Sequence, residues 1–579
     1  MSSPDVASPA ATRPLAALDD AAAYRVLQTR DARFDGRLFV GVTSTGIYCR
    51  PVCRVRAPKR ENCRFFGNAA SAEQQGFRPC LRCRPEQAPG LSLMDSSSVL
   101  ASRAALLLGL AAHEGLDPAL PDLAARLGVS DRHLRRIFNQ VHGVSPLAYL
   151  GTQRLLLAKQ LLTDTRLPVT EVAMATGFAS LRRFNAAFAL NYRMSPSALR
   201  KARAGGSALP AADPTDGRGQ AAAAPEPVLR LAWRPPYDLD GVLGFFARRA
   251  VPGVEQVAGL SLRRTFALQH RGQHLAGWLV LRFVPERCEV AMTVSTSLLP
   301  ALGGLLDRVR QALDLDADPA LIDPVLADIG PALQPGSYRP GIRLLGGLDG
   351  FEIATRVILG QQVTVAAART LTLRLVERFG APVVTPWADL NRLFPSAKAI
   401  AAATPEAIGT LGIVRQRVAA LRALAAEVAA GRLQLHRTAP LQPTLDALRA
   451  LPGIGDWSAQ LIAMRALAWP DAWPATDIAV LNALREHTGG ERDAVRAQAH
   501  AERWRPWRAY AVMKLWQLLE DTAAAPPALA AVHIVQAGSP AGKPASQTRA
   551  TAAMPAPATP LAPASPASPP QTLAPRDTP

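Results

Sequence analysis

Four cysteines in two close pairs constrain the N-terminal part of this chain more than any other feature. Three residues separate Cys49 from Cys53, and two residues separate Cys80 from Cys83. Thiolates at such short paired spacings commonly close a tetrahedral zinc site, and a four-cysteine site without histidine is ordinarily structural. We therefore expect a small domain folded around one zinc ion. Cys63, which lies between the two pairs, is expected only to be packed.

Positive charge is concentrated in the first part of the 579-residue chain. The net charge is +19, of which residues 16–90 supply +6 and residues 91–205 supply +7. A basic surface fits a polyanion partner such as a nucleic acid. An arginine-rich composition throughout a proteome would give a similar total, so the local clusters carry more weight than the sum.

The sequence lacks the features of secretion and of membrane insertion. Its start is polar and contains Pro4 and Asp5 rather than an apolar run, and no apolar segment approaches the length of a membrane span. Four of the six cysteines are clustered, which favours a metal site in a reducing compartment over a disulfide framework. We expect a cytoplasmic protein with no membrane partner.

Composition and periodicity divide the chain into several parts. Segments rich in Pro, Ser, Ala and Gly predict disorder or flexible linkers, and the periodic segments between them predict folded domains. The predicted fold class is multidomain, mainly α with α+β. The predicted boundaries are 1–15 (disordered), 16–90 (zinc domain), 95–203 (helical block), 204–227 (linker), 228–325 (α+β domain), 326–521 (all-α domain) and 525–579 (disordered tail).

The residues around the cysteines resemble the N-terminal zinc domain of Ada-type proteins, which respond to alkylated DNA. The similar segments are TSTGIYCRPVCRVRAPKRENCRFF and GFRPCLRCRPE, and the match runs from about Asp19 to Gln87. In that family the first zinc-bound cysteine accepts a methyl group from a methylphosphotriester in the DNA backbone. By resemblance this acceptor is Cys49, which one reaction consumes. A structural zinc module that only holds a basic surface together, or only anchors the chain to DNA, is the alternative.

A zinc-bound thiolate suits this chemistry because it remains anionic at neutral pH. A methylphosphotriester is neutral, so it approaches an anionic centre more easily than a phosphodiester does. Methylation removes one negative charge from the centre, which reduces repulsion against DNA phosphates and would act as a one-way electrostatic switch. For each candidate phosphate contact a merely solvated position is the alternative. The candidates are Arg56, Arg60, Arg78 and Arg82.

Two helix-turn-helix units are predicted in the helical block. In PDLAARLGVSDRHLRRIFNQ, Gly128 is the turn residue and Ser130 the cap of a basic helix, and Gly177 and Ser180 take these places in the second unit. Two such units joined by a long helix resemble the DNA-binding domain of AraC-type regulators, as do the segments GVSPLAYL and RMSPSALR. The candidate DNA contacts are Arg132, Arg135, Arg136, Arg182 and Arg183.

The C-terminal folded half resembles 3-methyladenine DNA glycosylases of the AlkA type. The similar segments are LAWRPPYDLDGVLGFFARRAV, GLDGFEIATRVILGQQVTVAAA, LPGIGDWSA and ERWRPWRAYAVMKLW. In LPGIG, Gly453 and Gly455 allow the tight turn of a helix-hairpin-helix, whose following amides can face a DNA phosphate. The resemblance also implies a monovalent cation bound by backbone carbonyls of this hairpin.

Asp477 is the predicted catalytic residue of this half. It lies 20 residues after Trp457, as the family requires, and it opens the apolar run IAVLNAL, so ordinary helix capping is the alternative interpretation. A carboxylate there would stabilise the positive charge that develops on the sugar when an alkylated base leaves. Trp457 and Trp516 are expected to stack on the flipped base, with core packing as the alternative.

Several positions bear on the type of reaction and on the substrate. Trp457 stands where endonuclease-III-like relatives have a Schiff-base lysine, and Cys288 is the one cysteine of this half, so neither lyase activity nor an iron–sulfur cluster is expected. Gln362 replaces the family's apolar wedge, and we expect it to fill the gap left by the flipped base while stacking poorly. Leu461 replaces an aromatic residue, which leaves the range of lesions open.

These resemblances identify the chain as a member of the Ada–AlkA fusions. They imply a methylphosphotriester-sensing activator of transcription joined to a monofunctional glycosylase. The implied partners are double-stranded DNA and RNA polymerase, and the protein is expected to be monomeric and nucleoid-associated in a bacterium. No second methyltransferase domain with a Pro-Cys-His-Arg motif is present, so repair of O6-methylguanine is not expected. The alternative is a regulator whose glycosylase fold is catalytically inactive.

Overall fold

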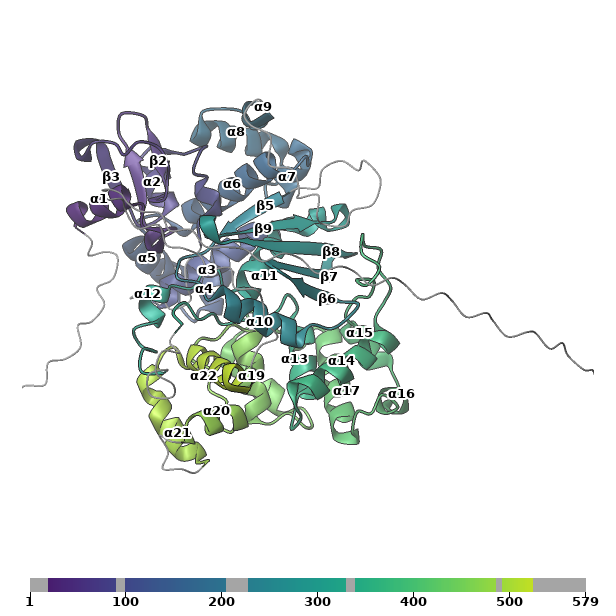
Figure 1. Ribbon diagram of the computed structural model, residues 1–579. Coiled ribbons are helices and arrows are strands. Elements are labelled where there is room, and N and C mark those ends of the chain that lie inside the picture. Colours follow the sequence, from purple (N-terminus) through teal and green to yellow (C-terminus); the bar gives the residue numbers. More distant parts are fainter. Residues whose placement is uncertain (1–18, 90–98, 205–227, 330–338, 486–491, 524–579) are drawn as a thin grey trace, which may run out of the picture. The chain divides into compact units, whose positions relative to one another are not determined.

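The computed structural model describes residues 19–89, 99–204, 228–329, 339–485 and 492–523 (Figure 1). The predicted N-terminal disorder and C-terminal tail, and nearly all of the predicted linker, lie outside these ranges. Within the described residues, no helix is both long enough and apolar enough to cross a membrane. Helices predominate, and the strands form two separate sheets, so the expected multidomain class, mainly α with α+β, is confirmed.

The cysteine-containing part folds around a four-stranded sheet in the order β3-β1-β2-β4. Strand β1 pairs antiparallel with β2 and β3, whereas β2 and β4 run parallel. Tyr48 of β2 is in register with Pro79 of β4, so Cys49 and Cys80, the next residues of the two segments, lie at the same end of the sheet. The elements are α1 (Asp20–Thr29), β1 (Phe39–Val42), β2 (Ile47–Cys49), β3 (Cys63–Phe66), α2 (Ala69–Gln74) and β4 (Arg78–Pro79).

The next part consists of helices with two helix-turn-helix units, as predicted. Gly128 and Gly177 adopt φ of +71° and +80°, which glycine tolerates without strain, and each turn is followed by a serine cap. Ser130 accepts from the backbone N–H of His133, and Ser180 from that of Arg183. The helices are α3 (Val99–Glu114), α4 (Leu120–Arg126), α5 (Asp131–His142), α6 (Pro146–Asp164), α7 (Val169–Ala175), α8 (Leu181–Tyr192) and α9 (Pro196–Ala204).

Five antiparallel strands in the order β5-β9-β8-β7-β6 form the α+β part. The segments SLRRTFALQH, QHLAGWLVLRFV and EVAMTV form the three consecutive strands β7, β8 and β9 of this part, which was expected to be α+β. The elements are β5 (Val228–Ala232), α10 (Leu239–Arg249), β6 (Glu255–Ala258), β7 (Ser261–His270), β8 (Gln273–Val284), β9 (Glu289–Val294), α11 (Leu302–Ala312) and α12 (Pro319–Ile322).

The last part is helical, as expected from its periodicity. The predicted helix-hairpin-helix is formed by α18, α19 and the tight turn between them. The helices are α13 (Gly350–Leu359), α14 (Val365–Phe379), α15 (Ala397–Ala402), α16 (Pro405–Gly409), α17 (Arg415–Ala429), α18 (Leu441–Arg449), α19 (Asp456–Arg465), α20 (Ile478–Ala483), α21 (Ala494–Ala501) and α22 (Arg508–Ala523).

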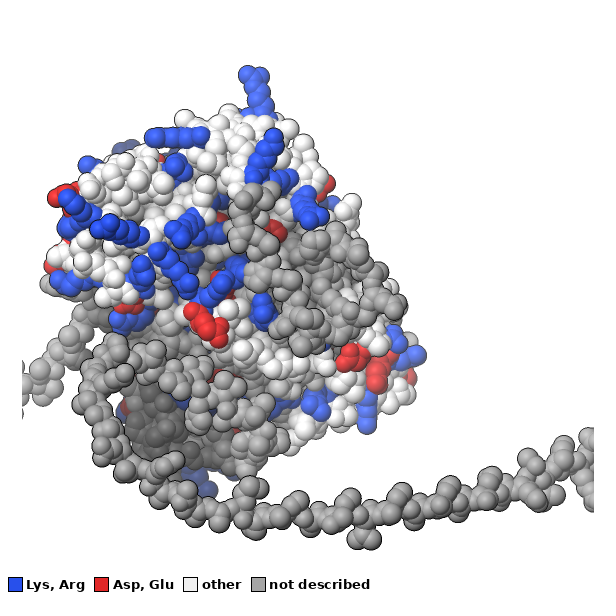
Figure 2. All heavy atoms as spheres, turned by 45° about the horizontal axis from the view of Figure 1, so that its top comes forward, with Lys and Arg blue, Asp and Glu red and all other residues white. Residues whose placement is uncertain are grey.

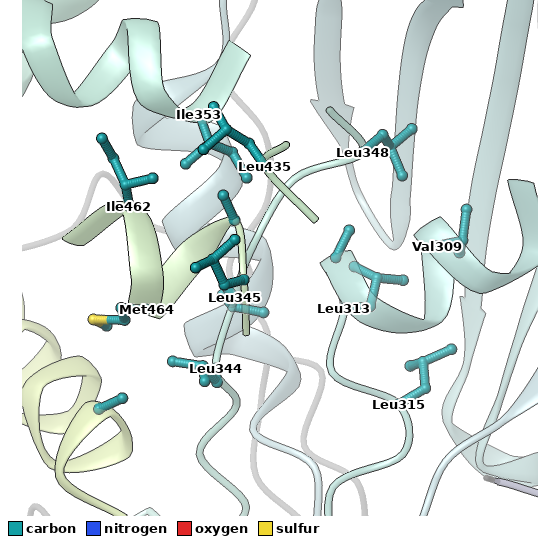
Figure 3. Close-up of a cluster of buried hydrophobic side chains, with 14 of the residues drawn as sticks. Val309, Leu313, Leu315, Leu344, Leu345, Leu348, Ile353, Leu435, Ile462 and Met464 are labelled. Atoms are coloured by element: carbon teal, nitrogen blue, oxygen red, sulfur yellow. The ribbon is translucent and has the colours of Figure 1, made fainter. Parts of the chain in front are cut away.

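A continuous apolar core joins α11 to the helices that carry the hairpin (Figure 3). Leu344 and Leu345 belong to an extended segment between these helices and are 3% and 2% exposed. They lie in one cluster with Ile462 and Met464 of α19, which are fully buried. Each buried aliphatic side chain stabilises the fold by about 1.5–3 kcal/mol, so α19 is firmly anchored behind the hairpin.

Candidate functional site

The four predicted zinc ligands come together. The Sγ atoms of Cys49, Cys53, Cys80 and Cys83 all lie within 4.8 Å of one another. The first three side chains are buried and Cys83 is partly exposed. Four thiols converging at this spacing match the donor chemistry of a tetrahedral zinc site, so the residues fit the ion that the sequence predicts. Cys63 is buried outside the cluster, where its thiol donates to the Lys59 carbonyl, in agreement with the expectation.

Backbone N–H groups bind two of the four sulfur atoms. The N–H of Arg50 donates to Cys83 Sγ at 3.4 Å, and the N–H of Arg82 donates to Cys80 Sγ at 3.4 Å. Within the described residues no hydrogen bond to the sulfur of Cys49 of this kind is found. A thiolate that accepts hydrogen bonds holds its charge more tightly and is a weaker nucleophile. The asymmetry favours Cys49 over Cys80 and Cys83 as the reacting sulfur.

A buried ion pair beside the cluster was not anticipated from the sequence. The Arg50 side chain donates to Asp35 Oδ1 at 2.8 Å and to the Cys83 carbonyl at 3.1 Å. Arg50 is 7% exposed and Asp35 only 2%, so the pair fixes the chain directly after Cys49. Asp35 lies 14 residues before Cys49 and belongs to no spacing pattern. Only the adjacency of Arg50 to Cys49 could have drawn attention to this ion pair.

The candidate phosphate contacts near the zinc cluster differ in availability. Arg56 and Arg82 are exposed, and Arg78 is partly exposed on β4. Arg60 pairs with Asp20 at 2.7 Å, and its guanidinium lies 5.2 Å from the centre of the Phe65 ring. Its charge is therefore partly neutralised within the domain, which makes it a weaker candidate than Arg56 and Arg82.

The helices that follow the two turns expose their basic residues. Arg132, Arg135 and Arg136 are exposed on α5, as are Arg182 and Arg183 on α8. Arg135 also pairs with Asp131, one helical turn earlier, at 3.0 Å. The face of the molecule in Figure 2 carries many more Lys and Arg side chains than Asp and Glu side chains. Such a surface attracts a polyanion over a distance set by the ionic strength.

Asp477 is held by three N–H donors. Its side chain accepts from the backbone N–H of Val480 at 3.0 Å, so it caps α20 as the alternative interpretation proposed. It also accepts from Trp457 Nε1 at 2.9 Å and from Trp516 Nε1 at 3.0 Å. The residue is 6% exposed, and each carboxylate oxygen receives an indole N–H. Capping and preorganisation of a charged carboxylate are therefore combined in one residue.

The two tryptophans lie on either oxygen of the Asp477 carboxylate. Both are partly buried at the edge of the core rather than enclosed by it. Trp516 lines an open pocket together with Phe245 of α10, whereas neither Trp457 nor Asp477 is among the residues that line it. Phe245 was not singled out from the sequence, although it lies in the segment GFFARRAV that carries the resemblance. Leu461 is buried at 5% exposure and gives the site no aromatic surface.

The hairpin between α18 and α19 has the geometry that its glycines predict. Gly453 adopts a φ of +74°, and a Cβ atom there would lie 3.3 Å from Ala420 Cβ, so a side chain would be both strained and crowded. Gly455 is exposed at the N-cap of α19, which leaves the first amides of that helix open. Gln362 is also exposed and has a φ of +54° in the turn before α14.

Among the described residues, the four-cysteine cluster is the one thiolate site that could hold a metal ion. Cys288 lies apart from it as a free thiol. Trp457 occupies the second position after Gly455, where its indole N–H binds Asp477 instead of providing an amine. The position therefore cannot form a Schiff base.

Comparison with known proteins divides the chain among four family models. They are the metal binding domain of Ada (residues 22–86), a helix-turn-helix domain (123–202), the AlkA N-terminal domain (228–349) and the HhH-GPD superfamily of base excision DNA repair proteins (355–509). A probable bifunctional transcriptional activator/DNA repair enzyme AlkA from Mycobacterium tuberculosis is 39% identical over 86% of this chain and 96% of its own length. The chain belongs to the Ada–AlkA family.

Two further relatives each match one part of the Ada–AlkA chain. DNA-3-methyladenine glycosylase 2 from Escherichia coli is 33% identical over 49% of this chain and 95% of its own length. The bifunctional transcriptional activator/DNA repair enzyme AdaA from Bacillus subtilis is 29% identical over 31% of this chain and 81% of its own length. The Ada–AlkA chain therefore contains both kinds of repair protein in one polypeptide.

Proposed function

We propose that this Ada–AlkA protein removes alkylated bases from double-stranded DNA and separately senses methylphosphotriesters to activate transcription. The observation that carries the first activity is the carboxylate of Asp477, whose two oxygens are held by the indole N–H groups of Trp457 and Trp516. The four converging thiols support the second. The exposed basic residues of α5 and α8 support recognition of promoter DNA.

Base excision follows from the placement of the carboxylate. An N-alkylated purine is cationic, so it leaves with the electron pair of the glycosidic bond and becomes a neutral base. Positive charge then develops on the sugar, where Asp477 stabilises it without reorganisation because its hydrogen bonds are already formed. Water adds to the sugar carbon and loses a proton, which yields an abasic site. No amine stands at Trp457, so strand cleavage does not follow.

Methyl transfer to Cys49 is the reaction proposed for the zinc domain. Zinc, when bound, keeps the thiolate of Cys49 ionised at neutral pH. The Cys49 sulfur attacks the methyl carbon, a C–S bond forms, the C–O bond breaks, and the phosphodiester anion leaves. The N–H groups of Arg50 and Arg82 bind the sulfurs of Cys83 and Cys80, which makes these two the weaker nucleophiles. The choice of Cys49 over Cys53 rests on the resemblance to the Ada-type zinc domain. Arg56 and Arg82 are the first candidates to bind the flanking phosphates.

The remaining partners are inferred from the same arrangement. We propose that the protein acts as a monomer on chromosomal DNA in the cytoplasm and contacts RNA polymerase at the promoters that it activates. A monovalent cation is proposed at the hairpin, where carbonyls next to Gly453 and Gly455 would bind it. The exposed amides of α19 would then hold a phosphate beside the cation.

The test of the excision activity is release of free base from duplex DNA containing 3-methyladenine and 7-methylguanine. We expect release by the wild type and a fall of about 100-fold or more in Asp477→Asn, because the amide cannot neutralise the developing charge. Asp389→Asn, in an exposed residue outside the hairpin, is the matched control. Equal release by wild type and Asp477→Asn would refute the assignment. Tight DNA binding without any release would favour a purely regulatory protein.

The methyl acceptor is tested with DNA carrying radiolabelled methylphosphotriesters. We expect label on the wild-type protein, in at most one methyl group per chain, and none on Cys49→Ala. Cys63→Ala is the control, since Cys63 lies outside the cluster. Labelling that survives Cys49→Ala would disprove the acceptor assignment.

A further inference from the structure

Gln361 connects the helix-hairpin-helix to the turn that carries Gln362. Its side-chain Nε2 donates to the Gly453 carbonyl at 2.8 Å and to Ser458 Oγ at 2.9 Å. Its own carbonyl accepts from Arg417 Nη2. One residue between α13 and α14 is therefore bound to the hairpin turn, to α19 and to α17, which come from three different places in the sequence.

Packing around the hairpin brings the same segments together, because the hairpin turn also rests on α17. A Cβ atom at Gly453 would lie 3.3 Å from Ala420 Cβ and 3.4 Å from the Gln416 carbonyl, both on α17. The hairpin turn thus rests on α17, and Arg417 of that helix binds Gln361. The turn before α14, the start of α17 and the hairpin form one unit.

The outer surface of this unit is exposed and partly apolar. Gln362 is exposed, and Val363 and Val414 beside the two turns are 37% and 56% exposed. The φ of +54° at Gln362 is unfavourable for a residue other than glycine and persists only where the surroundings impose it. The hydrogen bonds of the preceding residue supply this constraint. They tie the backbone next to Gln362, whose side chain is exposed, to the hairpin turn.

We propose that Gln361 is a positioning residue that sets where Gln362 enters DNA relative to the hairpin that grips the backbone. This inference rests on the proposed excision activity and deepens it. The hairpin fixes the phosphate backbone, and Gln362 occupies the space of the flipped nucleotide. A displaced Gln362 would then leave the base stacked even though the protein stays bound. Gln361 touches neither base nor sugar and acts only through its neighbours.

The experiment uses the full-length Gln361→Leu variant, which keeps the size of the side chain and removes both N–H donors. Duplex DNA with 2-aminopurine next to the alkylated base reports unstacking by its fluorescence, and base release is followed in single turnovers. We expect a smaller fluorescence rise and a fall in the excision rate of about 10- to 100-fold, as for a displacement near 1 Å. Binding to undamaged DNA should change little, because the hairpin amides remain.

Ser458→Ala and Gln434→Leu complete the design. Ser458→Ala removes one of the two acceptors of Gln361, and we expect an intermediate loss of unstacking. Gln434→Leu changes an exposed glutamine whose side chain contacts His436 rather than Gln361, and it should behave as wild type. If Gln361→Leu fails to fold, an intermediate loss in Ser458→Ala still supports the proposal, and wild-type behaviour of Ser458→Ala overturns it.

Two results would separate this inference from the proposed function. Wild-type unstacking and wild-type excision by a folded Gln361→Leu protein would overturn the positioning role while leaving the glycosylase intact. If the wild type unstacks DNA but releases no base, the proposed excision fails. The positioning role is then supported if Gln361→Leu loses the unstacking, and overturned if it does not.

Discussion

Asp477 uses both carboxylate oxygens before any substrate arrives. Each oxygen accepts an indole N–H, and the N-terminus of α20 supplies a further N–H. Charged hydrogen bonds of this kind hold a side chain in one rotamer and keep its charge in place. The tryptophans therefore have a second role in addition to the stacking expected from the sequence. Mutation should therefore separate the effect of ring stacking from the effect of the N–H hydrogen bond for each tryptophan.

Trp516→Phe tests this separation. The substitution keeps an aromatic face and removes the N–H that binds Asp477 Oδ1. A net loss of one charged hydrogen bond of about 1.4 kcal/mol corresponds to about a tenfold lower kcat. We expect KM to change less than kcat, measured by steady-state excision of 3-methyladenine. Trp387→Phe, in a tryptophan that packs against Trp278 away from Asp477, is the control. An unchanged kcat in Trp516→Phe would show that only stacking matters.

Asp314 makes the folding stability of the glycosylase half depend on pH. Burial raises the pKa of this carboxyl to about 6, although the N–H of Leu344 and the hydroxyl of Tyr510 bind it. The folded protein thus binds a proton more tightly than the unfolded chain. The stability that protonation of Asp314 contributes is fully present below pH 4, and it is lost as the pH rises from about 4 to 6.

Asp314→Asn should remove this dependence. Asparagine keeps an acceptor for Leu344 and tolerates the φ of +50° at this position. Relative to the wild type, we expect the variant to gain about 2 kcal/mol of unfolding free energy between pH 4 and pH 7. Urea unfolding at both pH values measures the difference. Parallel stability curves for the two proteins would contradict the raised pKa.

At the scale of single elements, the starts of the capped helices were predictable from the sequence. Hydrogen bonds between segments that are distant in the sequence were not. Ser180 and Gly177 mark the start of α8 by local chemistry, so a short window of sequence was sufficient. The paired cysteines likewise announce a site because their spacing is itself the signal. Gln361 gives no such signal, because its bonds to Gly453 and Ser458 span more than 90 residues. Contacts of this kind depend on tertiary packing and produce no periodic pattern in the sequence.

Ser180→Ala should weaken the beginning of α8. The serine hydroxyl accepts from the Arg183 N–H, and loss of an N-cap commonly costs about 1 kcal/mol. We expect faster hydrogen exchange at the first amides of α8 and weaker binding to promoter DNA. Ser197→Ala, in an exposed position within α9, should leave exchange in α8 unchanged. Equal exchange in the two variants would mean that the cap is not needed.

At the scale of the whole molecule, the two chemistries belong to separate cores. Cys49, Cys53 and Cys80 form a small cluster of their own, whereas Trp473 and Trp504 belong to the large core that includes the hairpin helices. The sequence predicts several domains from changes in composition, and their boundaries stay a prediction. It could not predict the Asp35–Arg50 pair, since nothing in the spacing of these residues separates a buried ion pair from a solvated one.

Loss of zinc should therefore affect one activity and spare the other. Cys53→Ser removes a ligand, and a small zinc domain depends on its ion for folding. We expect the bound zinc, measured by atomic absorption, to fall from one ion per chain to nearly none, and methyl transfer to disappear. Base excision should remain within about twofold, because none of the four cysteines belongs to the core that holds the hairpin helices. Cys63→Ser should keep both. Loss of excision in Cys53→Ser would show that the halves depend on each other.

The single cluster of thiols within the described residues also determines how long a signal would last. In the proposed excision reaction Asp477 would be regenerated after each base, so one polypeptide would clear many lesions. A thioether at Cys49 has no leaving group that the protein can expel, so each chain would record one event and keep that record for life. The signal would then fade only through proteolysis or through dilution as cells divide. The duration of the response would be set by the turnover of the protein, whereas its repair capacity would be set by catalysis.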